Sequence, residues 1–160
     1  LKSHSVGGTV GVPLSCTVKR VMEGRRNGGP ETVVVSLAGT VTAAGVSVTY
    51  GNGTVGSFVV SGATVTVNLT GVTDAQRLNV TIASVNDGTT TGDVVIPMGV
   101  LGGDVNGNGL VNASDVSLTK SQVGQTVGSA NFREDTNANG AINGSDVAPV
   151  KANAGVARPP

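Results

Sequence analysis

Two segments in the last third of the sequence repeat one spacing of oxygen-bearing side chains. Residues 104–115 read Asp-Val-Asn-Gly-Asn-Gly-Leu-Val-Asn-Ala-Ser-Asp, and residues 135–146 read Asp-Thr-Asn-Ala-Asn-Gly-Ala-Ile-Asn-Gly-Ser-Asp. Both place Asp or Asn at loop positions 1, 3, 5, 9 and 12 and glycine at position 6, the spacing of an EF-hand-type calcium loop. A single Asp/Asn/Gly cluster is typical of a surface turn, whereas two matching copies favour calcium.

The chemistry that this pattern serves is the binding of two Ca²⁺ ions. Calcium takes about six to eight oxygen ligands, and glycine at position 6 lets the backbone reverse so that alternate side chains turn inward. Position 7 would contribute its backbone carbonyl, position 9 a side-chain oxygen directly or through water, and position 12 a carboxylate. Two carboxylates per loop predict an affinity on the order of 10⁻⁶–10⁻³ M. The predicted ligands are Asp104, Asn106, Asn108, Leu110, Asn112 and Asp115 in the first loop and Asp135, Asn137, Asn139, Ala141, Asn143 and Asp146 in the second.

Composition excludes several other kinds of chemistry. The chain has 10 Lys and Arg against 10 Asp and Glu, so it has no net charge with which to attract nucleic acid or a membrane surface. Cys16 and His4 are the only residues of their types, which excludes disulfides, thiolate zinc sites and His-based acid–base chemistry. A hydrolase could use a carboxylate pair such as Asp74 with Asp87 or Asp93, but each of these lies in a turn-like stretch. A non-catalytic protein is therefore favoured.

The residues before the loops alternate apolar and polar side chains, which predicts half-buried strands. Asn52-Gly53 and Asp87-Gly88 are turn signals between such segments. Short strands at this spacing favour an antiparallel, Ig-like sandwich with Tyr50 and Phe58 in its core or at its rim. Strands are predicted at Val10–Leu14, Cys16–Val21, Thr32–Leu37, Val46–Tyr50, Ser57–Val60, Val65–Leu69, Leu78–Ile82 and Val94–Val100.

Each loop is followed by apolar residues at helical spacing, so we expect one short helix after each loop. Gly124 and Gly155 are natural stops for these helices. Pro149 is expected in the first turn of the second helix, where its missing N–H has no intrahelical acceptor.

This duplicated loop–helix arrangement, with Asp at position 12, resembles a type I dockerin module. The phrases Gly-Asp-Val-Asn-Gly-Asn-Gly and Asn-Ala-Ser-Asp-Val carry the resemblance, which covers residues 103 to about 155. The resemblance implies a small α dockerin-like domain of two calcium loop–helix (F-hand) repeats at 102–157, in a secreted bacterial protein. The change of pattern after Leu101 assigns the residues before it, 1–101, to the β-sandwich domain. The expected location is extracellular or at the cell surface, and the chain is expected to be the C-terminal part of a longer protein.

The resemblance also implies a partner and residues that contact it. The partner would be a cohesin-like domain or a domain of the parent protein, and the near-duplication permits binding in two orientations related by a half-turn. The alternative function is a carbohydrate-binding or adhesion module appended to a secreted polysaccharide-degrading enzyme. By position in the repeats, the expected partner contacts are Ala113, Ser114, Lys120 and Ser121 in the first and Gly144, Ser145, Lys151 and Ala152 in the second.

Overall fold

The structure is a computed structural model that describes residues 2–7, 21–23 and 31–159. The strand predicted at Val10–Leu14 lies outside these residues, as does the one at Cys16–Val21 except for Val21. The elements are β1 (Lys2–Gly7), β2 (Val21–Glu23), β3 (Glu31–Ser36), β4 (Gly45–Tyr50), β5 (Thr54–Ser61), β6 (Thr64–Thr70), β7 (Gln76–Asn86), β8 (Thr91–Val100), α1 (Ala113–Ser121) and α2 (Gly144–Ala152).

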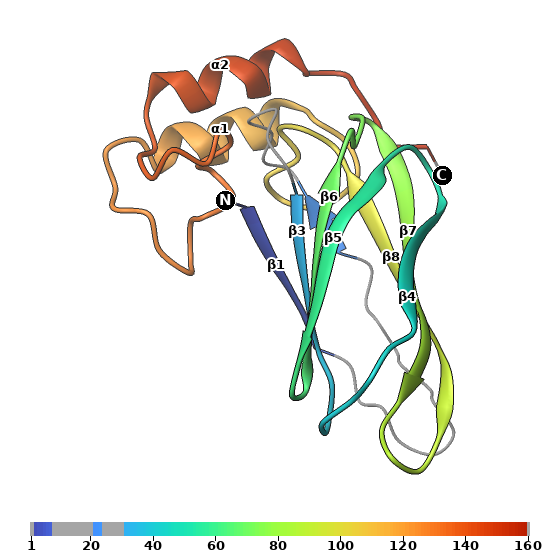
Figure 1. Cartoon of the computed structure of the whole chain (residues 1–160). Coiled ribbons are helices and arrows are strands. Elements are labelled where there is room, and N and C mark those ends of the chain that lie inside the picture. Colours follow the sequence, from blue (N-terminus) through green and yellow to red (C-terminus); the bar gives the residue numbers. More distant parts are fainter. Residues whose placement is uncertain (1, 8–20, 24–30, 160) are drawn as a thin grey trace. The chain divides into compact units, whose positions relative to one another are not determined.

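The strands form two four-stranded sheets, with the orders β1-β3-β6-β5 and β2-β8-β7-β4 (Figure 1). The predicted alternation decides which side chains lie between the sheets. Where β3 pairs with β6, Val33 lies opposite Val67 and Val35 opposite Val65. All four side chains are fully buried. Leu78, Val80 and Ile82 alternate in the same way on β7. The mainly β class with two helices that the sequence predicts is confirmed.

Two details differ from the predicted antiparallel sandwich. First, β1 pairs with β3 in parallel. The chain between them passes through β2 in the other sheet, and such a crossover allows the two strands to run in the same direction. Second, the register shifts between Val48 and Tyr50 and sets Tyr50 opposite Asn79 with 60% of its surface exposed, which excludes the core, but not the rim, of the two places predicted for it.

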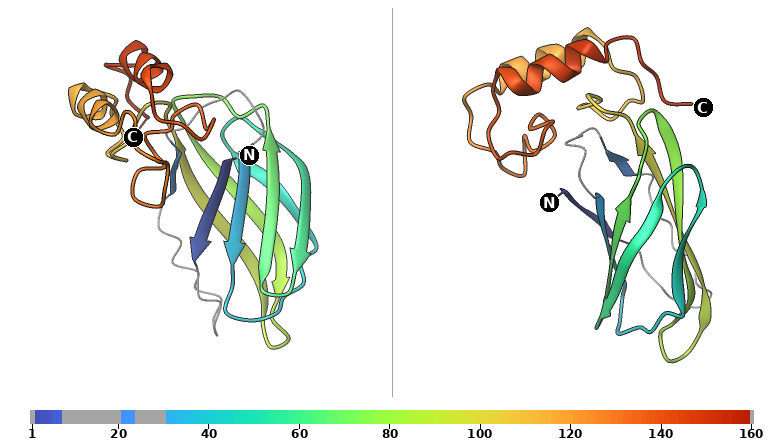
Figure 2. Two further views of the ribbon diagram at one scale, coloured as in Figure 1. Left: turned by 90° about the vertical axis from the view of Figure 1, so that its left-hand side faces the viewer. Right: turned by 45° about the horizontal axis from the view of Figure 1, so that its top comes forward.

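The chain divides into two compact units. Within residues 31–159, the first unit holds 31–73 and Arg77–Met98, and the second holds Asp74–Gln76 and 99–159. Each unit has its own apolar core: a large cluster between the sheets, and a smaller one built around Leu101, Val105, Val111 and Val150. In the second unit, α1 and α2 pack against each other (Figure 2). None of the helices described is long and apolar enough to cross a bilayer.

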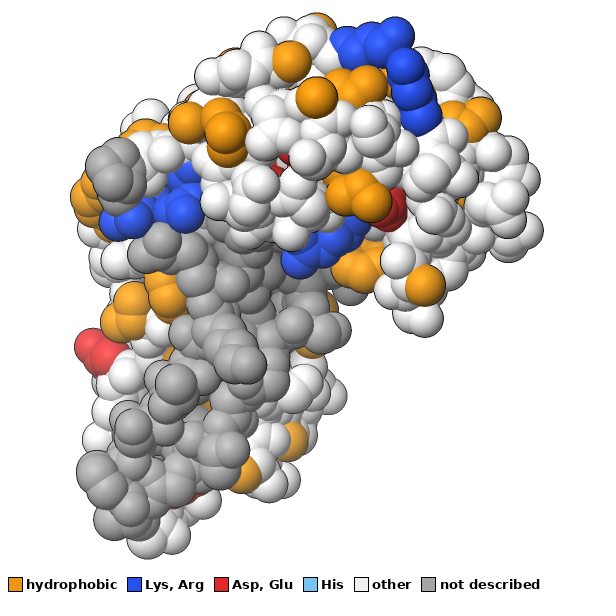
Figure 3. Space-filling view, turned by 180° about the vertical axis from the view of Figure 1, so that it is seen from behind, with side chains coloured by type: hydrophobic (Ala, Val, Ile, Leu, Met, Phe, Trp, Pro, Cys, Tyr) orange, Lys and Arg blue, Asp and Glu red, His pale blue; other side chains and the backbone are white. Residues whose placement is uncertain are grey.

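Charged residues make up a small part of the chain. On the described part of the face shown in Figure 3, the Lys, Arg, Asp and Glu side chains are scattered. This distribution agrees with a composition in which only 12% of residues are charged. The described part of this face therefore offers no broad electrostatic field for a polyanionic partner.

Candidate metal centre

The first loop winds around the carboxylate of Asp104, which is fully buried. Its Oδ1 accepts hydrogen bonds from the backbone N–H groups of Gly107 and Asn108, at 2.8 and 3.1 Å, and its Oδ2 accepts one from Gly109 at 2.8 Å. The N–H groups of positions 4, 5 and 6 thus converge on the side chain of position 1. This convergence closes the loop on its own first carboxylate.

Asp115 joins the first loop to the helix that follows it. Its Oδ1 accepts from the N–H groups of Val105 and Asn106 at 3.1 and 3.2 Å, and its Oδ2 accepts from Asn112 N–H at 2.9 Å. Asn112 is the N-cap of α1, and its Oδ1 in turn accepts from Ser114 N–H at 2.8 Å, which completes a capping box. One buried carboxylate therefore holds the loop and the start of α1 together.

The second loop repeats this arrangement. Asp135 is buried, and its oxygens accept from the N–H groups of Asn139 and Gly140, both at 3.0 Å. Asp146 is fully buried, and its Oδ2 accepts from the N–H of Asn143, the N-cap of α2, at 2.9 Å. The two loops that repeat in the sequence therefore also repeat the same hydrogen bonds in the structure.

The asparagines at positions 3 and 5 also direct their oxygens at the loop backbone. Asn106 Oδ1 accepts from Asn108 N–H at 3.0 Å, and Asn108 Oδ1 accepts from Leu110 N–H at 2.8 Å. Asn137 and Asn139 make the corresponding bonds at 3.0 and 2.9 Å. Each amide oxygen has two lone pairs, so each of these groups keeps one for a further donor or a cation.

The donor set of each loop fits a calcium ion. It comprises two carboxylates, three amide oxygens and a backbone carbonyl, which are the hard oxygen ligands that Ca²⁺ takes. The donors just described supply only partial positive charge to the buried carboxylates, whereas a divalent cation supplies full countercharge. In the described part of the chain, no group of three or more His, Cys, Asp or Glu side chains is placed to hold a metal ion by itself, and each loop completes its donor set with amides instead.

The glycines at position 6 adopt the left-handed backbone conformation that the reversal of each loop requires. Gly109 has φ +88° and Gly140 has φ +89°, in the left-handed region that other residues rarely occupy. Their N–H groups are the ones that reach Oδ2 of the position-1 aspartates. A side chain at either place would strain the turn that brings these groups together.

The helices begin where the capping boxes place them, and this corrects one expectation. Because α2 begins at Gly144, Pro149 is its sixth residue and lies beyond the first turn. The predicted place in the first turn was wrong. The N–H of Asn153 still bonds the carbonyl of Pro149 at 3.0 Å, and Val150 of the same turn is fully buried. Packing of the buried face therefore keeps α2 helical on both sides of Pro149, although the proline lacks an N–H.

The aspartates outside the loops hold backbone segments in place. Within the second unit, Asp74 Oδ1 accepts from Gly102 N–H at 2.7 Å. In the first unit, Asp93 Oδ1 accepts from Ser84 N–H at 2.9 Å, and Asp87 closes the turn between β7 and β8. Each carboxylate considered for hydrolytic chemistry thus has a structural partner.

Glu134 is a buried acid next to the second loop. Its Oε2 has no hydrogen-bond partner in the described structure. Burial raises the pKa of Glu134, and it outweighs the opposing effects of its own backbone N–H and of the Arg133 charge. Glu134 therefore takes up a proton at a higher pH than an exposed glutamate does.

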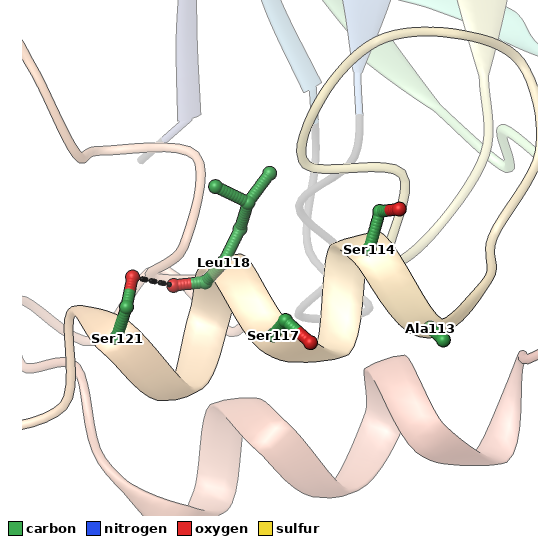
Figure 4. Close-up of a pocket in the computed structure, with 5 residues that line it drawn as sticks. All are labelled: Ala113, Ser114, Ser117, Leu118 and Ser121. Carbon is green, nitrogen blue, oxygen red and sulfur yellow. Dashed lines mark hydrogen bonds between the residues drawn. The ribbon is translucent and has the colours of Figure 1, made fainter.

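The residues predicted as partner contacts are all exposed. Three of them line a groove of about 460 Å³ along α1 (Figure 4). Ser117 and Leu118 also line the groove, and they were not predicted from the sequence. The side chain of Leu118 is 40% exposed. Ser121 Oγ donates a hydrogen bond to the backbone carbonyl of Leu118 at 2.7 Å. The full lining is Ala113, Ser114, Ser117, Leu118 and Ser121.

Two capped loop–helix repeats built on buried position-1 and position-12 carboxylates define an EF-hand-like module. Residues 102–153 match the family model of the type I dockerin domain. The resemblance drawn from residues 103 to about 155 is thereby confirmed. No curated protein and no solved structure matches the chain.

Proposed function

We propose that this chain is a non-catalytic, extracellular attachment or assembly module, with a β domain at 1–101 and a two-calcium docking domain at 102–157. The dockerin match supports a protein–protein docking module of the kind that binds cohesins. Calcium would be held by the predicted ligands of the two loops, and it would supply the countercharge for their buried carboxylates.

The observation that carries this proposal concerns the position-12 aspartates, which are predicted calcium ligands and also bond the caps of the helices. Asp115 and Asp146 each hydrogen-bond the N–H of the residue that caps the next helix, at 2.9 Å in both repeats. An ion that neutralises these carboxylates therefore also stabilises the starts of α1 and α2. Calcium binding and the order of the docking helices are coupled in this way.

The groove on α1 is the face we assign to the partner. It presents the exposed Leu118 among serine hydroxyls, an apolar contact surrounded by groups that can hydrogen-bond. The places of Ser117 and Leu118 are taken by Ala148 and Pro149 on α2, which are also exposed but offer no side-chain donor. This difference favours α1 as the docking face.

Calorimetric titration tests both parts of the proposal. Calcium should bind the intact chain with a stoichiometry of two and micromolar to millimolar affinity, and a cohesin domain should bind only the calcium-loaded form. Ser117→Arg, in the groove on α1, should abolish cohesin binding, whereas Ala148→Arg, at the same place in α2, should retain it. Absence of calcium binding would overturn the proposal, and loss of cohesin binding only in Ala148→Arg would move the docking face to α2.

A second candidate function is carbohydrate binding by the first unit. Tyr50, Arg77, Asn79 and Pro97 line a hollow of about 420 Å³, and Arg77 Nε is buried there without a hydrogen-bond partner in the described structure. An exposed aromatic ring beside amide and guanidinium donors can stack on a sugar and bond its hydroxyls. A screen against polysaccharides should then detect binding that Tyr50→Ala removes. Failure to bind any of the polysaccharides tested would count against this function.

A further inference from the structure

The middle of each calcium loop is paired with the segment that follows the helix of the other repeat. After α1, Gly124 N–H donates to the carbonyl of Ile142, position 8 of the second loop, at 2.9 Å. Thr126 forms an antiparallel bridge with Ala141, position 7 of that loop. The second loop is therefore supported by a segment that belongs to the first repeat.

The segment after α2 does the same for the first loop. Gly155 N–H donates to the carbonyl of Val111 at 2.8 Å, and Ala157 forms an antiparallel bridge with Leu110. Gly155 and Ala157 occupy the places that Gly124 and Thr126 have in the first repeat. The support of the two loops is thus reciprocal.

The pairing with the first loop extends over positions 6 to 8. Val111 N–H donates to the carbonyl of Val156 at 2.9 Å, and Arg158 N–H donates to the carbonyl of Gly109 at 3.0 Å. Val156 also packs on the small core that contains Val111. A Cβ on Gly109 would lie 3.3 Å from Nη2 of Arg158, so the guanidinium covers the loop closely at the glycine.

We infer that Gly155–Arg158 is a positioning element of the first calcium site. This inference rests on the proposed function and extends it beyond the family match, which stops at Asn153. The segment fixes Gly109, whose N–H bonds Asp104 Oδ2, and Leu110, whose carbonyl is the predicted position-7 ligand. It therefore sets the geometry of ligands in the first loop and leaves the second loop to the segment after α1.

The test compares calcium binding at the two loops in the full chain and in a chain that stops after Ala154. Titration is followed by NMR at the amides of Gly109 and Gly140, which report on each loop separately. Removal of residues 155–160 should weaken calcium at the first loop by roughly tenfold or more, the loss expected from two or more backbone hydrogen bonds. Affinity at the second loop should stay within about twofold.

A matched pair of variants keeps the test informative if the shortened chain fails to fold. Gly155 and Gly124 have φ +94° and +82°, and a Cβ at either place meets no atom within 4 Å, so alanine adds only backbone strain. Gly155→Ala should weaken mainly the first loop and Gly124→Ala mainly the second. Arg158→Gln, which keeps the main-chain pairing, should not weaken the first loop.

The outcomes separate this inference from the proposed function. If calcium binds the intact chain at both loops, but the shortened chain and Gly155→Ala lose affinity equally at both loops or at neither, the inference is overturned and the proposed function stands. If the intact chain binds no calcium, the proposed function fails and the inference fails with it.

Discussion

Asp87 shows how one exposed carboxylate stabilises a turn. Its Oδ1 accepts hydrogen bonds from Thr90 N–H at 2.8 Å and from Thr89 N–H at 2.9 Å. These bonds lower the pKa of Asp87, because they favour the charged form of the carboxyl group. The bond from Thr90 has the larger effect. The hairpin between β7 and β8 is therefore closed by a titrating group.

This shift predicts a pH dependence of the first unit. A group whose pKa is lower in the folded state contributes full stability above its unfolded pKa, about 3.9 for Asp, and loses it as the pH falls through the folded pKa. Asp87→Asn should remove this acid-side dependence while its Oδ1 still accepts both N–H bonds. Unfolding by urea between pH 2 and pH 5, in the intact chain and the variant, checks it; parallel pH profiles would contradict the prediction.

Among single residues, the spacing of side chains along the sequence predicted their place in the structure better than their residue type did. The positions of Asp104 and Asp115 follow from the loop repeat, since the ligands of a wound loop lie at fixed intervals. Tyr50 could not be placed in this way, because a register shift in β4 decides its face. Helical spacing could have found Ser117 and Leu118, because they lie one turn from Ala113, Ser114 and Ser121 on the same face of α1.

Proline inside α2 is a weakness of that element. Pro149 has no N–H with which to bond the carbonyl of Ser145 four residues earlier, and its side chain is exposed, so its replacement removes no buried contact. We predict that Pro149→Ala raises the free energy of unfolding of the second unit by about 1–3 kcal/mol. Calorimetric melting of the calcium-loaded chain measures this.

Leu118→Ala is the control for this substitution, because Leu118 occupies the same place in α1 and is also exposed. It should change the melting temperature little. A Pro149→Ala chain that melts no higher than the unsubstituted one would show that the backbone of α2 has already adapted fully to the proline.

At the scale of elements, the periodicity of the sequence predicted strands and helices but not all of their partners. Alternation placed β6 and β7, since one face of each is buried. The parallel pairing of β1 with β3 depends on the passage of the chain through β2 in the other sheet. The place of Pro149 within α2 depends on which residue caps the helix, and Asn143 does so.

The division of the whole molecule was only partly visible in the sequence. The change of pattern after Leu101 marks where the loop repeats begin. Asp74–Gln76, however, leads into β7, whose first residue is Gln76, and yet belongs to the second compact unit, where Asp74 bonds the N–H of Gly102. A contact between residues so far apart in the chain leaves no local signal.

The two units differ in what stabilises them, which predicts how the whole chain responds to loss of calcium. The first unit buries a continuous apolar cluster between its sheets, whereas the second has a small core and four buried aspartates in its loops. Without a cation, those carboxylates lose their countercharge and the small core is insufficient.

Differential scanning calorimetry of the full chain should therefore show two transitions in millimolar calcium. Excess chelator should abolish the transition of the second unit and leave that of the first within a few degrees, because the core of the first unit contains no calcium ligand. Magnesium should restore the lost transition poorly, since its roughly 2.0–2.1 Å octahedron is too small for this ligand set. An unchanged melting profile in chelator would contradict this account of the second unit, and a single transition that moves as a whole would show that the units unfold together.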